Sequence, residues 1–436
     1  MERTIDSELL LWKESRSRSV LLVRGARQVG KTYSIRKLST QFAHLAEVNF
    51  EEDLPVGSFF KDSLNPAGII EKLSAYYDVP IVKGDTLLFF DEIQACPDAL
   101  RSLRFFHEKM PELHVVAAGS LLEFTLAEIP SFGVGRITNL FMYPMTFNEF
   151  LTATQGKALS TVIAKASLSD PIDHAIHKKL LDRFRVYQML GGMPAVVEAY
   201  RSGSDLRTCQ NVIDGLLTSF RDDFAKYKKR SPVMKLQEVF ESVVYQAGRK
   251  FKYSNVSSTG NSQGYKDALE LLVKAGLVYK VHHSSARGVP LGAQMNPNKF
   301  KAIVFDLGIH QRILGLDISD ILIEDDIQLI NKGSLAECFV GLELIAHSSP
   351  RLHPSLYYWH REARASNAEV DYVIQLNEEV VPVEVKAGTK GQMQSMAIFI
   401  KERDLEKGIR LSHENFAKFG NIQIIPIYAV SRLRDI

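Results

Sequence analysis

The sequence predicts an α/β protein with an α/β region at each end and a mainly helical segment between them. Strand and helix signals alternate through the first 155 residues, and strand signals return after residue 356. A Gly-rich turn at residues 25–32 stands between an apolar run and a helical stretch. Strands that alternate with helices favour a parallel sheet covered by helices.

The first region contains five short apolar runs that read as strands. They are Ser19–Arg24, His44–Phe50, Thr86–Asp91, His114–Gly119 and Ile137–Tyr143. Residues 156–230 lose the strand signals and contain two helical stretches, Lys178–Leu190 and Leu206–Lys226. The first of these helices is stopped by Gly191-Gly192-Met193-Pro194, because Gly and Pro end helices.

The second half divides into two further parts. Two helices, Met234–Ala247 and Gln263–Ala275, precede two strands, Leu277–His282 and Lys301–Asp306, which is the order of a winged helix. The last part has a helix at Gly333–His347 and strands at Leu356–His360, Val370–Gln375, Val380–Val385 and Ile422–Val430. We therefore expect domains at residues 1–155, 156–230, 231–318 and 319–436.

Composition indicates an ordinary globular chain. Of its 436 residues, 45% are hydrophobic and 24% charged, and the net charge of +2 is too small to argue for nucleic acid. The three cysteines, Cys96, Cys209 and Cys338, have no metal-ligand spacing and favour a reducing cytoplasm. We expect neither a signal peptide nor a membrane span, because no apolar run reaches ~18 residues.

The Gly-rich turn predicts an ATP site. Its residues match GxxxxGK[ST] in full: Gly25, Ala26, Arg27, Gln28, Val29, Gly30, Lys31 and Thr32. The backbone N–H groups of such a loop wrap phosphates, and the helix that follows adds favourable partial charge. We expect Lys31 to reach the β- and γ-phosphates and Thr32 to bind Mg²⁺. A chance Gly-rich turn is the alternative.

A matching acidic strand end follows the turn. Thr86–Asp91 is an apolar strand whose last residue, Asp91, is placed to hold Mg²⁺. Glu92 comes next and is placed to act as general base on the attacking water. A hydrophobic run that ends in Asp-Glu is common by itself, but the upstream turn makes the pair a strong signal.

These motifs resemble a prokaryotic family of AAA+ ATPases that carry a C-terminal domain of unknown function. The resemblance rests on residues 24–32, 49–51, 91–94, 119–120, 135–136, 143–147 and 191–194, and it spans nearly the whole chain. It implies a P-loop AAA+ core with a parallel sheet, a helical lid, a winged helix and a restriction-endonuclease-like α/β end.

The same resemblance implies roles for three further residues. Ser120 holds the position of the polar residue that senses the γ-phosphate, where Asn is more usual. Arg136 is a candidate arginine finger that acts on the ATP of a neighbouring subunit in a homo-oligomer, or else an ordinary surface arginine. Pro194 is expected near the adenine, and an ordinary helix stop is the competing interpretation.

The C-terminal region holds four residues that belong together in a nuclease pattern. The order of Glu337, Asp371, Glu384 and Lys386 resembles the PD-(D/E)XK motif, although Val370 replaces its proline. The resemblance implies that the three carboxylates hold Mg²⁺ and that Lys386 orients the attacking water. The alternative is a solvated sheet face on which Lys386 pairs with Glu384.

Three functions follow from these motifs. The first is an ATP-hydrolysing enzyme coupled to DNA binding or to metal-dependent DNA cleavage. The second is a nucleotide-operated switch that binds a protein partner and carries an inactive nuclease-like domain. The third is a DNA-binding regulator that uses Lys266 and Lys274 of the winged helix, although Glu270 lies on the same face. Packing against the lid is the alternative for that helix.

Overall fold

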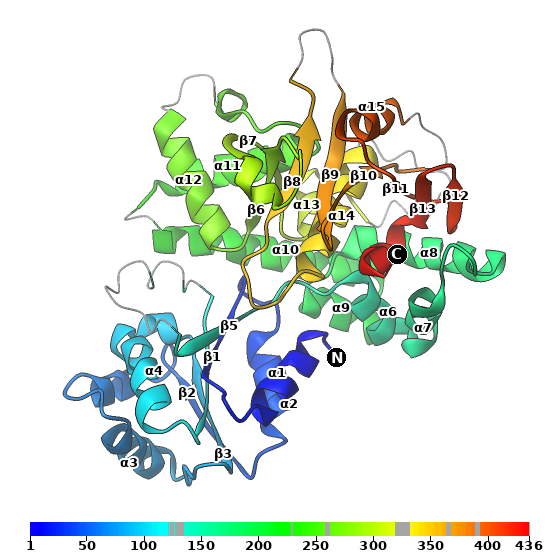
Figure 1. Cartoon of the computed structure of the whole chain (residues 1–436). Helices are drawn as coiled ribbons and strands as arrows, with labels where there is room; N and C mark the ends of the chain where they lie inside the picture. Colours follow the sequence, from blue (N-terminus) through cyan, green and yellow to red (C-terminus); the bar gives the residue numbers. More distant parts are fainter. Residues whose placement is uncertain are drawn as a thin grey trace. The chain divides into compact units, whose positions relative to one another are not determined.

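The computed structural model describes residues 1–120, 122, 126, 135–227, 230–257, 262–318, 332–362, 368–388 and 393–435. The chain divides into two compact units (Figure 1). The first unit consists of Met1–Tyr143, Lys274–Gly276 and Ser349–His353, and the second of Pro144–Val273, Leu277–Ser348 and Pro354–Ile436. Residues 319–331, where the last domain was expected to begin, lie outside the described residues.

The first unit contains a five-stranded parallel sheet, as the sequence predicts. Its strands are β1 (Val20–Arg24), β2 (His44–Asn49), β3 (Thr86–Asp91), β4 (His114–Ala118) and β5 (Ile137–Phe141). Their order in the sheet is β2-β3-β4-β1-β5, and every pairing is parallel. The carboxyl ends of all five strands therefore lie at one edge of the sheet.

Helices cover both faces of this sheet (Figure 1). They are α1 (Ile5–Glu14), α2 (Lys31–Ser39), α3 (Pro66–Tyr77) and α4 (Pro97–Lys109), with short 3₁₀ turns η1 (Leu54–Phe60) and η2 (Ile93–Ala95). β3 and β4 are buried along their whole length, because helices lie on each side of them. One core cluster joins alternate residues of the strands, such as Leu88 and Phe90, to Leu73 of α3 and Phe106 of α4.

The second unit begins with helices and has further helices between its strands. They are α6 (Phe147–Gln155), α7 (Lys157–Lys165), α8 (His174–Leu190), α9 (Pro194–Arg201), α10 (Leu206–Asp223), α11 (Val233–Tyr245), α12 (Ser262–Lys274), α13 (Leu307–Ile313), α14 (Lys332–Ala346) and α15 (Gln394–Arg403), with 3₁₀ turns η3 (Phe224–Tyr227), η4 (Tyr253–Asn255), η5 (Leu291–Gln294) and η7 (Ile427–Arg434). The predicted boundary at residue 155 falls at the end of α6. This helix belongs to the second unit because Phe147 and Phe150 pack against Tyr187 of α8.

An eight-stranded mixed sheet forms the other layer of the second unit. Its strands are β6 (Val278–Ser284), β7 (Met295–Val304), β8 (Leu356–His360), β9 (Glu369–Leu376), β10 (Glu379–Val385), β11 (Gly408–Ser412), β12 (Ala417–Phe419) and β13 (Ile422–Pro426). Their order is β12-β13-β11-β10-β9-β8-β6-β7. The β6–β7 hairpin, expected as the wing of a separate winged helix, pairs through β6 with β8 and so joins the C-terminal strands in one sheet.

The sequence does not predict strands β11 and β12 or helix α15 of this region. β11 lies between β10 and β13 and pairs in parallel with both, while α15 makes the connection from β10 to β11. Five residues that include the charged Arg410 give a weak strand signal, and only the neighbouring strands make β11 a central one. In the described part of the chain, no helix is both long and apolar enough to cross a membrane.

Candidate functional site

The Gly-rich turn connects the end of β1 to the start of α2. Gly25 has a φ of +141°, and a Cβ atom at this position would lie 2.1 Å from the carbonyl oxygen of Met142. Gly30 has a φ of +96° and forms the N-cap of α2. Both positions therefore require glycine, one for close backbone approach and one for the left-handed turn that starts the helix.

The side chain of Lys31 folds back over this turn. Its ammonium donates hydrogen bonds to the carbonyl oxygens of Gly25 at 3.1 Å and Ala26 at 2.8 Å. Burial lowers the pKa of Lys31 to about 8, against the opposing effect of the carboxylates of Glu92 and Asp91. A buried cation above a turn of backbone N–H groups is the arrangement that attracts phosphate groups.

Thr32 and Asp91 meet next to the turn. The Thr32 hydroxyl donates to Oδ2 of Asp91 at 2.7 Å, although 59 positions separate the two residues in the chain. Burial raises the pKa of Asp91, and the hydrogen bond from Thr32 partly offsets this rise. A hydroxyl and a buried carboxylate side by side are a donor set that fits Mg²⁺, as the sequence predicts.

Glu92 leaves the sheet directly after Asp91. Its backbone is left-handed, with a φ of +47°, a conformation that is strained for a residue with a side chain. Gln94 donates from Nε2 to Oε2 of Glu92 at 2.6 Å, and so it fixes the carboxylate. Gly119 leaves room for Gln94, because a Cβ there would lie 2.2 Å from the Gln94 Oε1 atom. Sequence reasoning gave Gln94 no role.

Three predicted groups lie at the same edge of the sheet because their strands are neighbours. β4 lies between β1 and β3, all three run parallel, and their carboxyl ends lead to the turn, to Asp91 and to Ser120. Ser120 is buried, with 9% of its surface exposed. The sheet order thus places a hydroxyl between the phosphate-binding turn and the acidic strand end.

Arg136 lies at the opposite edge of the sheet. It directly precedes β5, which pairs in parallel with β1 and matches Ile137 to Val20, the first residue of that strand. The turn at residues 25–30 follows the other end of β1. Arg136 contacts Glu108 of α4, with 2.5 Å between Nε and Oε1. This position directs Arg136 away from the ATP site of its own chain.

The Gly-Gly-Met-Pro segment packs within the second unit. Gly191 ends α8 with a φ of +73°, and Pro194 is the first residue of α9. A Cβ on Gly192 would lie 2.1 Å from the carbonyl oxygen of Met145, and the Gly192 amide donates to Oδ2 of buried Asp306 at 2.7 Å. These contacts account for the glycines as a helix stop that docks tightly. An adenine contact of Pro194 stays a prediction.

Two of the predicted carboxylates, Glu337 and Asp371, lie around a lysine that sequence reasoning missed, together with Glu369, which was not predicted either. The ammonium of Lys301 lies 2.7 Å from Oε1 of Glu337, 2.6 Å from Oε1 of Glu369 and 4.0 Å from Oδ1 of Asp371. Burial by itself would lower the pKa of Lys301, but the carboxylates of Glu337, Asp371 and Glu369 raise it above its ordinary value. Burial raises the pKa of Glu337 to about 7, against the effect of Lys301.

Glu384 and Lys386 form the other part of this cluster. The β9–β10 hairpin forms as predicted, with Val383 opposite Tyr372, and Asp371 accepts a hydrogen bond from the Val385 amide at 2.8 Å. Lys386 donates to Glu384 at 2.7 Å. Glu384 is only 6% exposed, so the sheet face is not solvated there, but the pairing of Lys386 with Glu384 that the alternative expected is present. Burial, with the Asp371 carboxylate nearby, raises the pKa of Glu384 to about 7.

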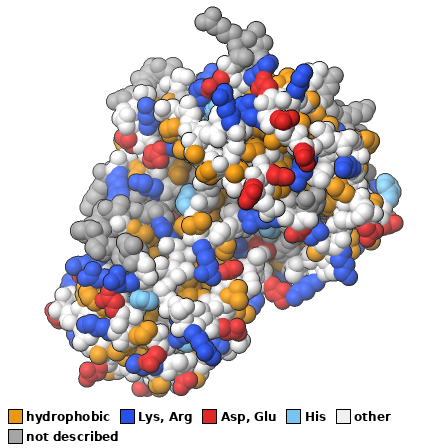
Figure 2. All heavy atoms as spheres, in the orientation of Figure 1, with side chains coloured by type: hydrophobic (Ala, Val, Ile, Leu, Met, Phe, Trp, Pro, Cys, Tyr) orange, Lys and Arg blue, Asp and Glu red, His pale blue; other side chains and the backbone are white. Residues whose placement is uncertain are grey.

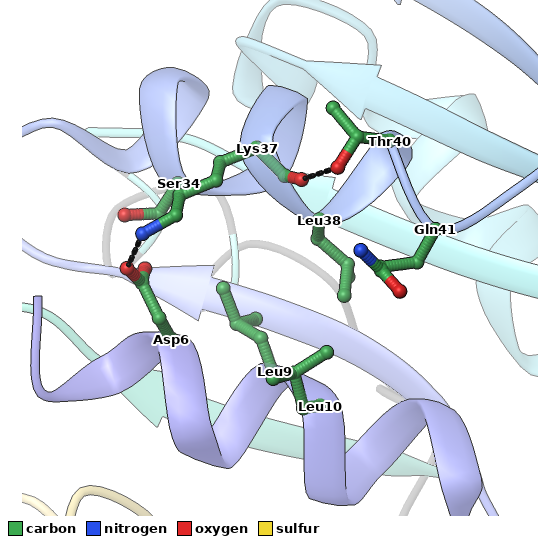
Figure 3. A pocket seen from close by; sticks show the side chains of 8 residues that line it. All are labelled: Asp6, Leu9, Leu10, Ser34, Lys37, Leu38, Thr40 and Gln41. Carbon is green, nitrogen blue, oxygen red and sulfur yellow. Dashed lines mark hydrogen bonds and ion pairs between the residues drawn. The ribbon is translucent and has the colours of Figure 1, made fainter. Parts of the chain in front are cut away.

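A separate pocket lies between α1 and α2 (Figure 3). Leu9, Leu10 and Leu38 form its apolar part. Lys37 donates to Asp6 at 2.7 Å, and the Thr40 hydroxyl donates to the Lys37 carbonyl at 2.8 Å. These polar groups already satisfy one another, so the pocket offers little to a phosphate compared with the turn at residues 25–32.

Comparison with known proteins assigns the first unit to a class. Residues 17–151 match the model of an AAA domain. Residues 181–320 match a domain of unknown function (DUF8612), and residues 332–430 match another (DUF4143). Together with the turn, the Thr32–Asp91 pair and the parallel sheet, the first of these matches identifies residues 17–151 as an AAA-type P-loop domain.

One relative and two solved structures show what this chain is similar to. An uncharacterized protein of Methanocaldococcus jannaschii is 23% identical over 95% of this chain and 84% of its own length. The Walker-type ATPase of Pyrococcus abyssi is 14% identical with a TM-score of 0.45, over 72% of this chain and 96% of that one. The RuvB Holliday junction branch migration motor of Thermotoga maritima is 16% identical with a TM-score of 0.30, over 73% and 96%.

Proposed function

We propose that this chain binds ATP with Mg²⁺ and hydrolyses it at the turn formed by residues 25–32. The observation that carries the proposal is the 2.7 Å hydrogen bond between Thr32 and Asp91, which brings the turn and the acidic strand end together. The backbone of residues 25–30 binds the phosphates, and Lys31 releases the carbonyls of Gly25 and Ala26 to contact them.

The remaining residues of the site act on the metal, the water and the γ-phosphate. Thr32 and Asp91 hold Mg²⁺, which when bound neutralises negative charge on the phosphates. Glu92 accepts a proton from the attacking water, and Gln94 sets the direction of its carboxylate through the 2.6 Å hydrogen bond. Ser120 donates to the γ-phosphate. Arg136 acts on the site of a neighbouring subunit in a homo-oligomer, since it lies at the far edge of its own sheet.

The test is a comparison of ATP binding with phosphate release in wild type, Lys31→Ala and Glu92→Gln. We expect Lys31→Ala to lose binding, and Glu92→Gln to keep binding while phosphate release falls about 10²–10⁴-fold. Gln94→Ala should lower the rate of hydrolysis with little change in affinity. Phosphate release by Glu92→Gln at the wild-type rate would remove Glu92 as the base.

A nucleotide-operated switch that binds a protein partner is the second candidate function. Its support is the buried ammonium of Lys301 beside Glu337 and Asp371, two of the three carboxylates that the nuclease pattern reserves for Mg²⁺. On the face in Figure 2, basic side chains are interspersed with acidic ones over the described residues, which gives a DNA interface no particular support. Partner capture that depends on ATP and survives Glu384→Ala is the result that the switch requires.

DNA cleavage and DNA binding are tested by two separate assays. Linear, circular and branched DNA, incubated with Mg²⁺ or Mn²⁺ with and without ATP, should stay intact with wild type and Lys386→Ala alike. Cutting by wild type that is lost in Lys386→Ala would instead support a nuclease function. Salt-sensitive DNA binding that is lost on neutralising Lys266 and Lys274 would instead support a DNA-binding regulator.

A further inference from the structure

One lysine joins three elements of the second unit. Lys301 lies on β7, Glu337 on α14, and Glu369 and Asp371 on β9. The Lys301 side chain is 1% exposed, so water cannot solvate its charge. A buried ammonium is stable only when nearby groups satisfy both its charge and its hydrogen-bond donors.

The surroundings of Lys301 meet this requirement. Its ammonium donates to Glu337 at 2.7 Å and lies 2.6 Å from Glu369, with Asp371 at 4.0 Å. The ring of Tyr358 lies beneath the charge, 5.2 Å from the ring centre to Nζ. One oxygen each of Glu337, Glu369 and Asp371 therefore faces the Lys301 nitrogen.

A divalent cation does not fit this arrangement. Mg²⁺ or Mn²⁺ would need the same oxygens at about 2.0–2.2 Å, which would force it against the ammonium. Two positive charges in one buried space repel strongly, because little water screens them. Over the described residues, no group of three or more His, Cys, Asp or Glu side chains is arranged to hold a metal ion.

We propose that the Lys301 ammonium permanently takes the place of a divalent cation among Glu337, Glu369 and Asp371, and that these contacts fasten β7 to α14 and β9. These three carboxylates then hold no metal ion that could activate water for phosphodiester cleavage. Lys301 neutralises Glu337, Glu369 and Asp371 as a metal ion would, but it brings no open coordination position for water. This inference is independent of ATP hydrolysis in the first unit.

The experiment counts bound Mn²⁺ by electron paramagnetic resonance in the full-length, nucleotide-free protein. Wild type and Glu337→Gln should bind the same number of ions, because Glu337 holds none. Lys301→Met keeps the length of the side chain but removes the charge, and it should bind one additional Mn²⁺ per chain. The double variant Lys301→Met/Glu337→Gln is the matched control and should lose that ion.

Melting temperatures with and without Mn²⁺ give a second readout. Lys301→Met should melt below wild type, and Mn²⁺ should raise its melting temperature but not that of the double variant. The proposal fails if wild type loses a bound ion on Glu337→Gln or on the milder Glu369→Gln. It also fails if folded Lys301→Met gains no ion. Should Lys301→Met not fold, the comparison of wild type with Glu369→Gln decides the question in either direction.

Discussion

ATP affinity should fall steeply above pH 8, because the cation that contacts the phosphates loses its proton there. Burial lowers the pKa of Lys31 to about 8 in the nucleotide-free protein. Bound phosphate oxygens favour the charged ammonium and raise its pKa in the complex. ATP binding above pH 8 must therefore take up a proton at Lys31, and it weakens as protons become scarce.

The size of the effect follows from this pKa. At pH 7 about one-tenth of the nucleotide-free protein has neutral Lys31, so affinity is close to its maximum. At pH 9 about nine-tenths is neutral, which weakens binding about tenfold, or about 1.4 kcal/mol. Between pH 8.5 and 9.5 the dissociation constant should rise almost in proportion to the hydroxide concentration.

Fluorescent ATP titrations from pH 7 to 9.5 measure this dependence. Calorimetry in buffers of different ionisation enthalpy should find uptake of about one proton per ATP bound at pH 9. The matched control is Lys31→Arg, whose guanidinium keeps its charge over the whole range. A dissociation constant that stays flat to pH 9.5, without proton uptake, would refute the reasoning, as would equal pH dependence in Lys31→Arg.

Three further predictions concern the fold and the neighbouring subunit. Gly25→Ala should lower the free energy of unfolding by about 3 kcal/mol or more and abolish ATP binding, because its Cβ would lie 2.1 Å from the Met142 oxygen. The control is Gly68→Ala in α3, which has open space around it and should change the free energy of unfolding by under about 1 kcal/mol in denaturant titrations. Burial raises the pKa of Asp306 to about 6, above the ordinary value of 3.8, so the folded state binds more protons, and wild type should lose about 2.4 kcal/mol relative to Asp306→Asn as pH rises from 4 to 7; a pH-independent difference in urea unfolding contradicts this. Phosphate release should be low for Arg136→Ala and Lys31→Ala separately and recover on mixing them, and no recovery in a stable mixed oligomer would exclude a finger in trans.

The sequence predicts the turn at residues 25–32 and its neighbouring acidic strand end well, because both depend on short motifs. Residues 25–32 specify their turn through glycines that no other residue replaces, and the run of apolar residues before Asp91 is buried along its whole length, as its composition predicts. The parallel order then follows from alternating strands and helices. The exception is Gln94, whose contact with Glu92 depends on a left-handed residue that gives no signal in the sequence.

The second unit is predicted less well because its key contacts join distant segments. The hairpin of β9 and β10 is local and is predicted correctly, with buried Glu384 and half-buried Asp371 on neighbouring strands. The pairing of β6 with β8 joins residues more than 70 positions apart, such as Val281 and Leu356, and no local pattern encodes it.

The sequence by itself determined the class of the first unit, the residues of its phosphate-binding turn and the presence of acidic residues in the last sheet. Only the tertiary structure decided the chemistry of those acidic residues. In the sequence Lys301 is only the first residue of a predicted strand, and it becomes their counterion because β7 joins the sheet beside α14. The physical reason is that a buried charge pairs with the opposite charge that the fold brings close to it, however far apart the two residues are in the sequence.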